Sequence, residues 1–272
     1  MPRGRPHLNV PVFSQRLIDI AEICALSLWR GTDYESGEKM ETSDEAFLAE
    51  YALGFEAKRK SPNSPFVIDE VALRRMIRVG KLKAMFRSTN PIDFANGLKT
   101  IEAVIQKYDA FRKRRIPKTP SEFALEIALD LGGSFVTWTR VPTINGNYRI
   151  PLASRILSFG FPLLPIFNFS NGLASKMRFQ SRPQAALPSY FRTLEIGLLR
   201  NAACLGALKP PHMPIGMSQQ TWRNILARKW WQRRVLDIAL LLHFKVTKVA
   251  PNILRDAGRR RRQSLKAAAA KK

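Results

Sequence analysis

The chain has 272 residues, of which 45 are Lys or Arg and 21 are Asp or Glu, so its formal net charge is +24. A hydrophobic share of 45% excludes wholesale disorder, and the length suits one large domain or two small ones. The two cysteines, Cys24 and Cys204, exclude a disulfide framework and a zinc site built on CxxC pairs.

Apolar periodicity and capping residues predict helices in the first half of the chain. Ser14 is positioned to cap a helix that ends just before Gly31, and a short helix is expected from about Asp69 to Gly80. Asn90, followed by a proline, predicts the start of a longer helix. Residues 119–122 form a capping box for the next helix, which we expect to end at a glycine pair, residues 132–133.

The second half continues in the same way. We expect helices over residues 152–159, near Ser170 and over residues 191–208, and one long final helix that starts near Ser218. No run of alternating strands or internal repeat is evident. The sequence therefore predicts a mainly α, compact multi-helix domain over residues 13–250. A division of it into two lobes, about 13–118 and 119–250, stays open.

Positive charge is concentrated in the second half. Residues 1–150 carry 23 basic and 18 acidic residues, a net charge of +5, whereas residues 151–272 carry 22 basic and three acidic residues, a net charge of +19. Such a segment repels itself unless a polyanion neutralises it, and nucleic acid is the usual polyanion. A protein that is merely basic is the alternative.

Both termini extend this pattern. Residues 2–6, Pro-Arg-Gly-Arg-Pro, look like the core of an AT-hook, in which Arg3 and Arg5 would enter the narrow minor groove of A·T-rich DNA. A plain basic arm over residues 1–12 is the other interpretation. Residues 251–272, with four consecutive arginines and a low-complexity Ala/Lys end, predict a disordered basic tail, equally readable as a nuclear localisation signal.

Several classes of site find no support in the sequence. The phosphate-binding GxxxxGK[ST] loop, the dinucleotide-binding glycine fingerprint and the HExxH zinc motif are absent, and the three histidines are scattered. The acidic stretch of residues 33–56 is interpreted as a solvated face rather than a metal site. We expect no cofactor and no metal.

No secretory leader or membrane span is evident either. The longest uncharged stretch, residues 156–175, contains prolines and asparagines that suit a buried segment better than a bilayer. We expect an intracellular protein without a membrane partner, in the cytoplasm or nucleoid, or in the nucleus of a eukaryote. The sequence does not indicate the oligomeric state.

Residues 150–168, IPLASRILSFGFPLLPIFN, resemble the region after the hairpin in the helix-hairpin-helix DNA glycosylase superfamily, in particular its diverged 8-oxoguanine glycosylase-like branch. In that branch a helix of the type SR(I/V)L(F/S)F precedes a proline turn, the sequence Pro-(I/V)-(Y/F)-Asp and another helix. Residues 231–240 look like the closing helix of the same branch. The two segments cover about a third of the chain, and no glycine hairpin accompanies them. Two ordinary core helices joined by a proline turn are the alternative.

The resemblance implies an enzyme that extrudes a nucleotide from duplex DNA and cleaves its N-glycosidic bond, in a setting such as phage defence. The family's catalytic aspartate corresponds to Asn168, which can hold a water molecule but supplies no negative charge. No lysine matches the family's lyase residue, so a monofunctional hydrolase is implied.

Further site residues follow from their positions near this segment. Trp138, in a polar loop expected over residues 137–140, and Phe167, next to Asn168, are candidates for the base pocket. The candidates for contacts to DNA phosphates lie in a stretch without any acidic residue from 149 to 193, and they are Arg155, Lys176, Arg178 and Arg182.

Two functions remain in view at this point. The first is a double-stranded DNA-binding glycosylase, which predicts that Asn168 lies in a pocket together with Phe167. The second is a non-catalytic chromatin-like or plasmid-associated DNA-binding protein, which predicts that Asn168 caps a helix with no cavity beside it. RNA binding would fit the charge equally well.

Overall fold

The computed structural model describes the chain over residues 10–61, 63, 71, 91–113, 118–138, 150–179, 182–255 and 258, and for residues 91–97 and 134–138 the description covers the backbone only. The short helix expected from Asp69 to Gly80 and the tail beyond residue 258 therefore lie outside the described residues. Within these ranges the protein is mainly helical and holds no β-strand, only an isolated bridge between Thr32 and Lys39. The predicted α class is confirmed for this part of the chain.

The first helices of the chain are α1 (Gln15–Trp29) and a nearly continuous run of α2 (Asp44–Phe47), a π-helical turn (Leu48–Ala52) and α3 (Leu53–Lys60). The Ser14 side chain caps α1 by accepting a hydrogen bond from the Leu17 N–H, as the sequence predicts. Gly31, just beyond the helix, has a φ of +80°, a conformation that glycine adopts without strain.

Two long helices follow, α5 (Pro91–Arg112) and α6 (Pro120–Trp138). The predicted capping box at the start of α6 is confirmed, because Glu122 accepts from the Thr119 N–H while the Glu122 N–H donates to Thr119 Oγ1. The predicted end at Gly132 is wrong. A Cβ at Gly132 would lie 2.6 Å from Ile150 Cδ1, so this glycine permits close helix packing and α6 continues past it.

The second half holds α7 (Ile150–Gly160), α8 (Asn171–Lys176), α9 (Pro183–Arg200), α10 (Ala202–Gly206), α11 (Gln219–Ala227) and α12 (Trp230–His243). The long helix predicted from Ser218 is in fact two helices, because Lys229 adopts a left-handed conformation with a φ of 59° between them. The helix predicted over residues 191–208 begins earlier, with Pro183 at its first position, and breaks at Asn201.

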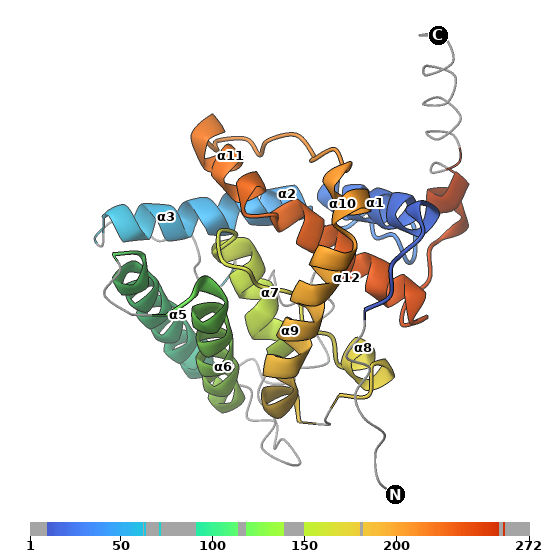
Figure 1. Ribbon diagram of the computed structural model, residues 1–272. Coiled ribbons are helices and arrows are strands. Elements are labelled where there is room, and N and C mark those ends of the chain that lie inside the picture. Colours follow the sequence, from blue (N-terminus) through green and yellow to red (C-terminus); the bar gives the residue numbers. More distant parts are fainter. Residues whose placement is uncertain are drawn as a thin grey trace, which may run out of the picture.

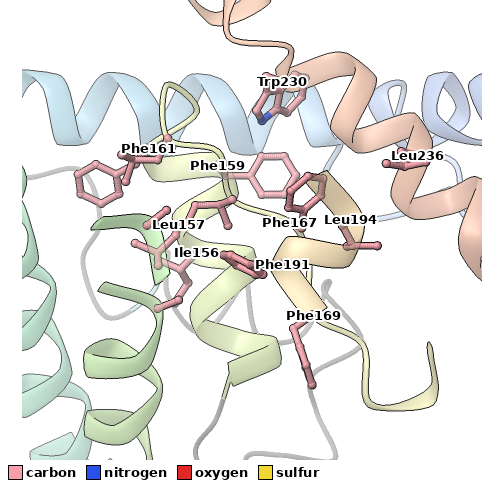
Figure 2. Packing of buried hydrophobic residues seen from close by; sticks show 14 of the residues in the cluster. Ile156, Leu157, Phe159, Phe161, Phe167, Phe169, Phe191, Leu194, Trp230 and Leu236 are labelled. Atoms are coloured by element: carbon pink, nitrogen blue, oxygen red, sulfur yellow. The ribbon is translucent and has the colours of Figure 1, made fainter. Parts of the chain in front are cut away.

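Helix α7 is the central element of the arrangement. Figure 1 shows α5 and α6 side by side on one flank of α7, α9 and α12 on the other, and α1 packed against α12. Aromatic and aliphatic side chains from α7, the loop after it, α9 and α12 converge on one core (Figure 2). Burial on this scale is the main source of stability in such a helical protein.

Both predicted boundaries of the domain need correction. Val10 is fully buried against Gly197 of α9, and Asn201 accepts a hydrogen bond from the Phe13 N–H and donates to the Pro11 carbonyl. At the other end residues 251–255 are helical, and Ile253 is buried. The packed part of the chain therefore begins before residue 13 and continues beyond residue 250, because apolar side chains at both ends find a place in the core.

Candidate functional site

The loop between α7 and α8 is held in place by buried hydrogen bonds. Ser154 Oγ of α7 accepts from the Phe169 N–H at 3.0 Å. The buried Arg233 guanidinium of α12 donates to the carbonyls of Pro162 at 3.2 Å and Leu164 at 2.8 Å. Because charged donors make strong hydrogen bonds in a low-dielectric interior, these contacts fix the path of the chain that leads to Asn168.

Asn168 is anchored through its backbone on both sides. Its N–H donates to Asp237 Oδ2 at 3.1 Å, and its carbonyl accepts from the Tyr190 hydroxyl at 3.1 Å. The residue that caps α8 is Ser170, whose Oγ accepts from the Leu173 N–H. Asn168 is therefore not a helix cap, and its side-chain amide also hydrogen-bonds the Asp237 carboxylate.

A cavity of about 200 Å³ lies beside Asn168. Its walls come from six parts of the chain: α1, the segment after it, which contributes Tyr34 and Met40, α7, the loop that follows α7, α8 and α12. The N-terminal half thus takes part in the cavity, which the sequence did not indicate. Pockets for drug-sized ligands measure roughly 300–1,000 Å³, so this one suits a single heterocycle better than a whole nucleotide.

The carboxylate in the cavity wall belongs to Asp237. Its side chain is only 5% exposed, and loss of hydration on burial raises its pKa to about 7. The Asn168 N–H, Arg234 and Arg233 oppose this effect and favour the ionised form. Asp237 therefore sits close to the midpoint of its titration at neutral pH, as acid–base groups in active sites commonly do.

Two arginines of the cavity wall share one buried partner, Asp44 of α2. Arg234 donates to Asp44 Oδ2 from Nε at 3.0 Å and from Nη2 at 2.7 Å, and Arg155 Nη2 lies 3.2 Å from Asp44 Oδ1. Burial would lower the pKa of Arg234, but the Asp44 carboxylate outweighs burial and raises it. Asp44 is 2% exposed, so the interpretation of the acidic stretch as a solvated face is wrong at this residue.

This arrangement also corrects the role predicted for Arg155. Its side chain, 19% exposed, is engaged by Asp44 inside the protein and lines the cavity, so it is not a free surface cation for a DNA phosphate. The attraction of a buried carboxylate holds it inward.

Three buried polar atoms of the cavity wall lack a hydrogen-bond partner among the residues that the structure describes. They are Asn168 Oδ1, Asp237 Oδ1 and Arg155 Nε. Buried polar groups are nearly always satisfied, and each exception calls for a bound molecule or a functional role. Two acceptors and one donor in one small cavity can bind a polar heterocycle or ordered water.

The aromatic candidates do not join Asn168 as expected. Phe167 is 1% exposed, its ring packs against Phe191 in the core (Figure 2), and it lines a separate cavity beside α9 and α12. The prediction that Phe167 shares the pocket of Asn168 is wrong, because the Phe167 ring packs into the core against Phe191 of α9. Trp138 is the last residue of α6, and its side chain lies outside the described residues. The aromatic residues beside Asn168 are instead Tyr34 and Phe169.

The remaining predicted phosphate contacts lie on the surface close to the cavity. Lys176, Arg178 and Arg182 are exposed at the end of α8 and the start of α9. A Cβ at Gly172 would lie 2.9 Å from Val246 Cγ1, so α8 adjoins the loop that carries the exposed Lys245 and Lys248. We call these five residues, Lys176, Arg178, Arg182, Lys245 and Lys248, the α8 basic patch. Arg3 and Arg5 lie outside the described residues.

Asp237 and Asp44 are the functional candidates that sequence reasoning missed. One weak signal was present, because Asp237 is one of only three acidic residues in the strongly basic second half, and it stands within an apolar helical run. An acidic residue at such a position needs a specific partner. Nothing in the sequence indicated that Asp44 would meet residues more than a hundred positions away.

The described residues contain no group of three or more His, Cys, Asp or Glu side chains placed to hold a metal ion. They also contain no helix with the length and apolar character needed to cross a membrane. Comparison of the chain with known proteins finds no matching family model, curated protein or solved structure.

Proposed function

We propose that this protein is a double-stranded DNA-binding, monofunctional N-glycosylase with a helix-hairpin-helix glycosylase-like fold, which binds an extruded base in the cavity beside Asn168. The observation that carries the proposal is the position of Asn168. The residue that matches the family's catalytic position by sequence lines a small cavity and does not cap a helix. The α7–loop–α8 order also follows the pattern of the resembling segment.

The surroundings of the cavity suit this task. Tyr34 and Phe169 provide aromatic surface for a base, and base–aromatic stacking contributes about 1–3 kcal/mol per base. In this proposal the exposed cations of the α8 basic patch would bind the phosphates on either side of the extruded nucleotide. Extrusion costs least at a modified or mispaired base, which is one source of selectivity.

A non-catalytic DNA-binding protein is the second candidate, and one observation favours it. Residue 168 is an amide, so the negative charge that stabilises a sugar cation is missing at the family's own position. In that case the basic patch and the two termini would provide binding alone, and the cavity would be a remnant.

The test uses end-labelled duplexes that each carry one modified base, including uracil, 8-oxoguanine and glucosylated hydroxymethylcytosine. After incubation, hot alkali converts any abasic site into a strand break. The parent protein is compared with Asn168→Ala and with the matched control Asn171→Ala, an exposed amide three residues away.

Strand breaks with the parent and the Asn171→Ala control, reduced at least about a hundredfold with Asn168→Ala, are the expected result. Salt-sensitive binding without breaks on any duplex would favour the non-catalytic protein. Equal breakage by Asn168→Ala would place the reaction elsewhere.

A further inference from the structure

The cavity beside Asn168 contains a carboxylate on a different helix from the one that the resemblance implies. Asp237 lies on α12, 69 positions further along the chain, and its Oδ2 accepts the Asn168 N–H at 3.1 Å. Its Oδ1 has no partner among the described residues. One oxygen is thus held in place by the loop, and the other lies buried in the wall of the cavity, without a hydrogen-bond partner from the described part of the chain.

The charges around the cavity also favour an ionised carboxylate here. Arg155 and Arg234 bring two positive charges, and Asp44 balances one of them. Arg233, on the same helix as Asp237, adds a further positive charge that attracts the carboxylate. Two further acidic residues, Asp33 and Glu35 of the segment after α1, also line the cavity.

We propose that Asp237 is the catalytic carboxylate of this site and supplies the negative charge that residue 168 lacks, while Asn168 holds it and the attacking water. The inference rests on the proposed function. When the bond from C1′ to the base nitrogen breaks, the electron pair leaves with the base, which takes a proton from solvent, and positive charge develops on the sugar. Water then forms a bond to C1′, and its proton passes through Asp237 to solvent.

This assignment explains why two oxygens in the cavity are without partners. A carboxylate oxygen aimed at a developing cation gains most when the cation is present, because both groups are then removed from water. The amide oxygen of Asn168 can orient a water molecule in the ground state. A structural carboxylate, in contrast, would be expected to use both oxygens on protein donors.

The experiment measures binding to duplexes in which one nucleotide is replaced by an abasic analogue. A pyrrolidine analogue carries a positive charge where the sugar cation forms, and a tetrahydrofuran analogue is its neutral counterpart. Transition-state mimics bind more tightly than ground-state ones, so the parent should prefer pyrrolidine over tetrahydrofuran by on the order of tenfold or more. Asp237→Asn should lose this preference. Asn168→Ala removes a side-chain hydrogen bond to Asp237 but leaves the carboxylate and the larger contribution of the backbone N–H, so it should keep the preference.

The exchange variant Asn168→Asp/Asp237→Asn, in which the carboxylate moves to the other position, should regain the preference, and it guards against misreading a folding defect. A preference that survives Asp237→Asn in a folded variant overturns the inference and leaves the glycosylase proposal standing. A parent that binds both analogues no better than unmodified duplex overturns the proposed function itself.

Discussion

The backbone N–H of Asn168 donates to Asp237 Oδ2 at 3.1 Å, and this bond joins the loop after α7 to helix α12 at the edge of a cavity. The two side chains that the proposed chemistry requires, an amide and a carboxylate, therefore meet although they come from distant parts of the chain. Next to them, Arg234 of α12 donates a hydrogen bond to Asp44 of α2, and this contact joins the cavity wall to the N-terminal part of the chain. The cavity is therefore built from several distant parts of the chain rather than from one motif.

The first prediction concerns the pH dependence of stability. Burial raises the pKa of Asp237 to about 7 from its ordinary value of 3.8, so the folded protein binds this proton more tightly than the unfolded chain. The stabilisation from the proton is complete below about pH 4 and is lost as the pH rises through 7, at a rate of up to about 1.4 kcal/mol per pH unit.

Urea unfolding of the parent and of Asp237→Asn at several pH values checks this prediction. The variant carries a neutral group at every pH, and other titrating groups cancel in the comparison. The parent should therefore lose stability relative to the variant between about pH 4 and 7. A constant difference across that range would show that the Asp237 carboxyl titrates at its ordinary pKa.

The second prediction concerns Asp44. Asp44→Asn removes the charge that Arg155 and Arg234 share, and breaking a buried ion pair on one side costs about 3–5 kcal/mol. The neighbouring change Glu45→Gln affects an ion pair to the exposed His212 and should cost less than about 1 kcal/mol. Urea titrations give the free energy of unfolding of both variants. Equal losses would contradict the conclusion that Asp44 forms the buried ion pairs with Arg155 and Arg234.

Local features of this fold were predictable where a short motif determines them. Ser14 and the Thr119–Glu122 box are helix starts encoded by adjacent residues, and the structure confirms both. The glycine at residue 132 is ambiguous from sequence, because the same residue type serves a helix end and a close approach between helices. Only the position of Ile150 distinguishes the two.

The cavity was predictable only in part. The resemblance of residues 150–168 directed attention to Asn168, but the side of the loop to which each neighbour points depends on contacts with α9 and α12. The Phe167 ring accordingly packs in the core, and Phe169 lines the cavity. The pairing of Asp44 with Arg234 joins residues 190 positions apart, and periodicity carries no information about such contacts.

A third prediction tests the N-terminal boundary of the packed domain. Val10 is fully buried against Gly197, whereas Val12, two residues further, is 72% exposed. Val10→Ala should therefore lower the free energy of unfolding by about 1–3 kcal/mol, and Val12→Ala should change it by less than about 0.5 kcal/mol. If both substitutions change thermal or urea unfolding equally little, Val10 does not contribute to the packed domain.

The last prediction concerns the α8 basic patch. Each DNA phosphate neutralised by a lysine or arginine adds about 0.9 to the slope of log affinity against log salt concentration. If Lys176, Arg178 and Arg182 each contact a phosphate, replacing all three with alanine should reduce that slope by about 2.7 for any duplex sequence. Lys39→Ala, an exposed lysine within the acidic stretch, is the control and should leave the slope unchanged. Fluorescence anisotropy over a range of salt concentrations measures this slope. An unchanged slope in the triple variant would show that DNA binds elsewhere than at α8 and the cavity.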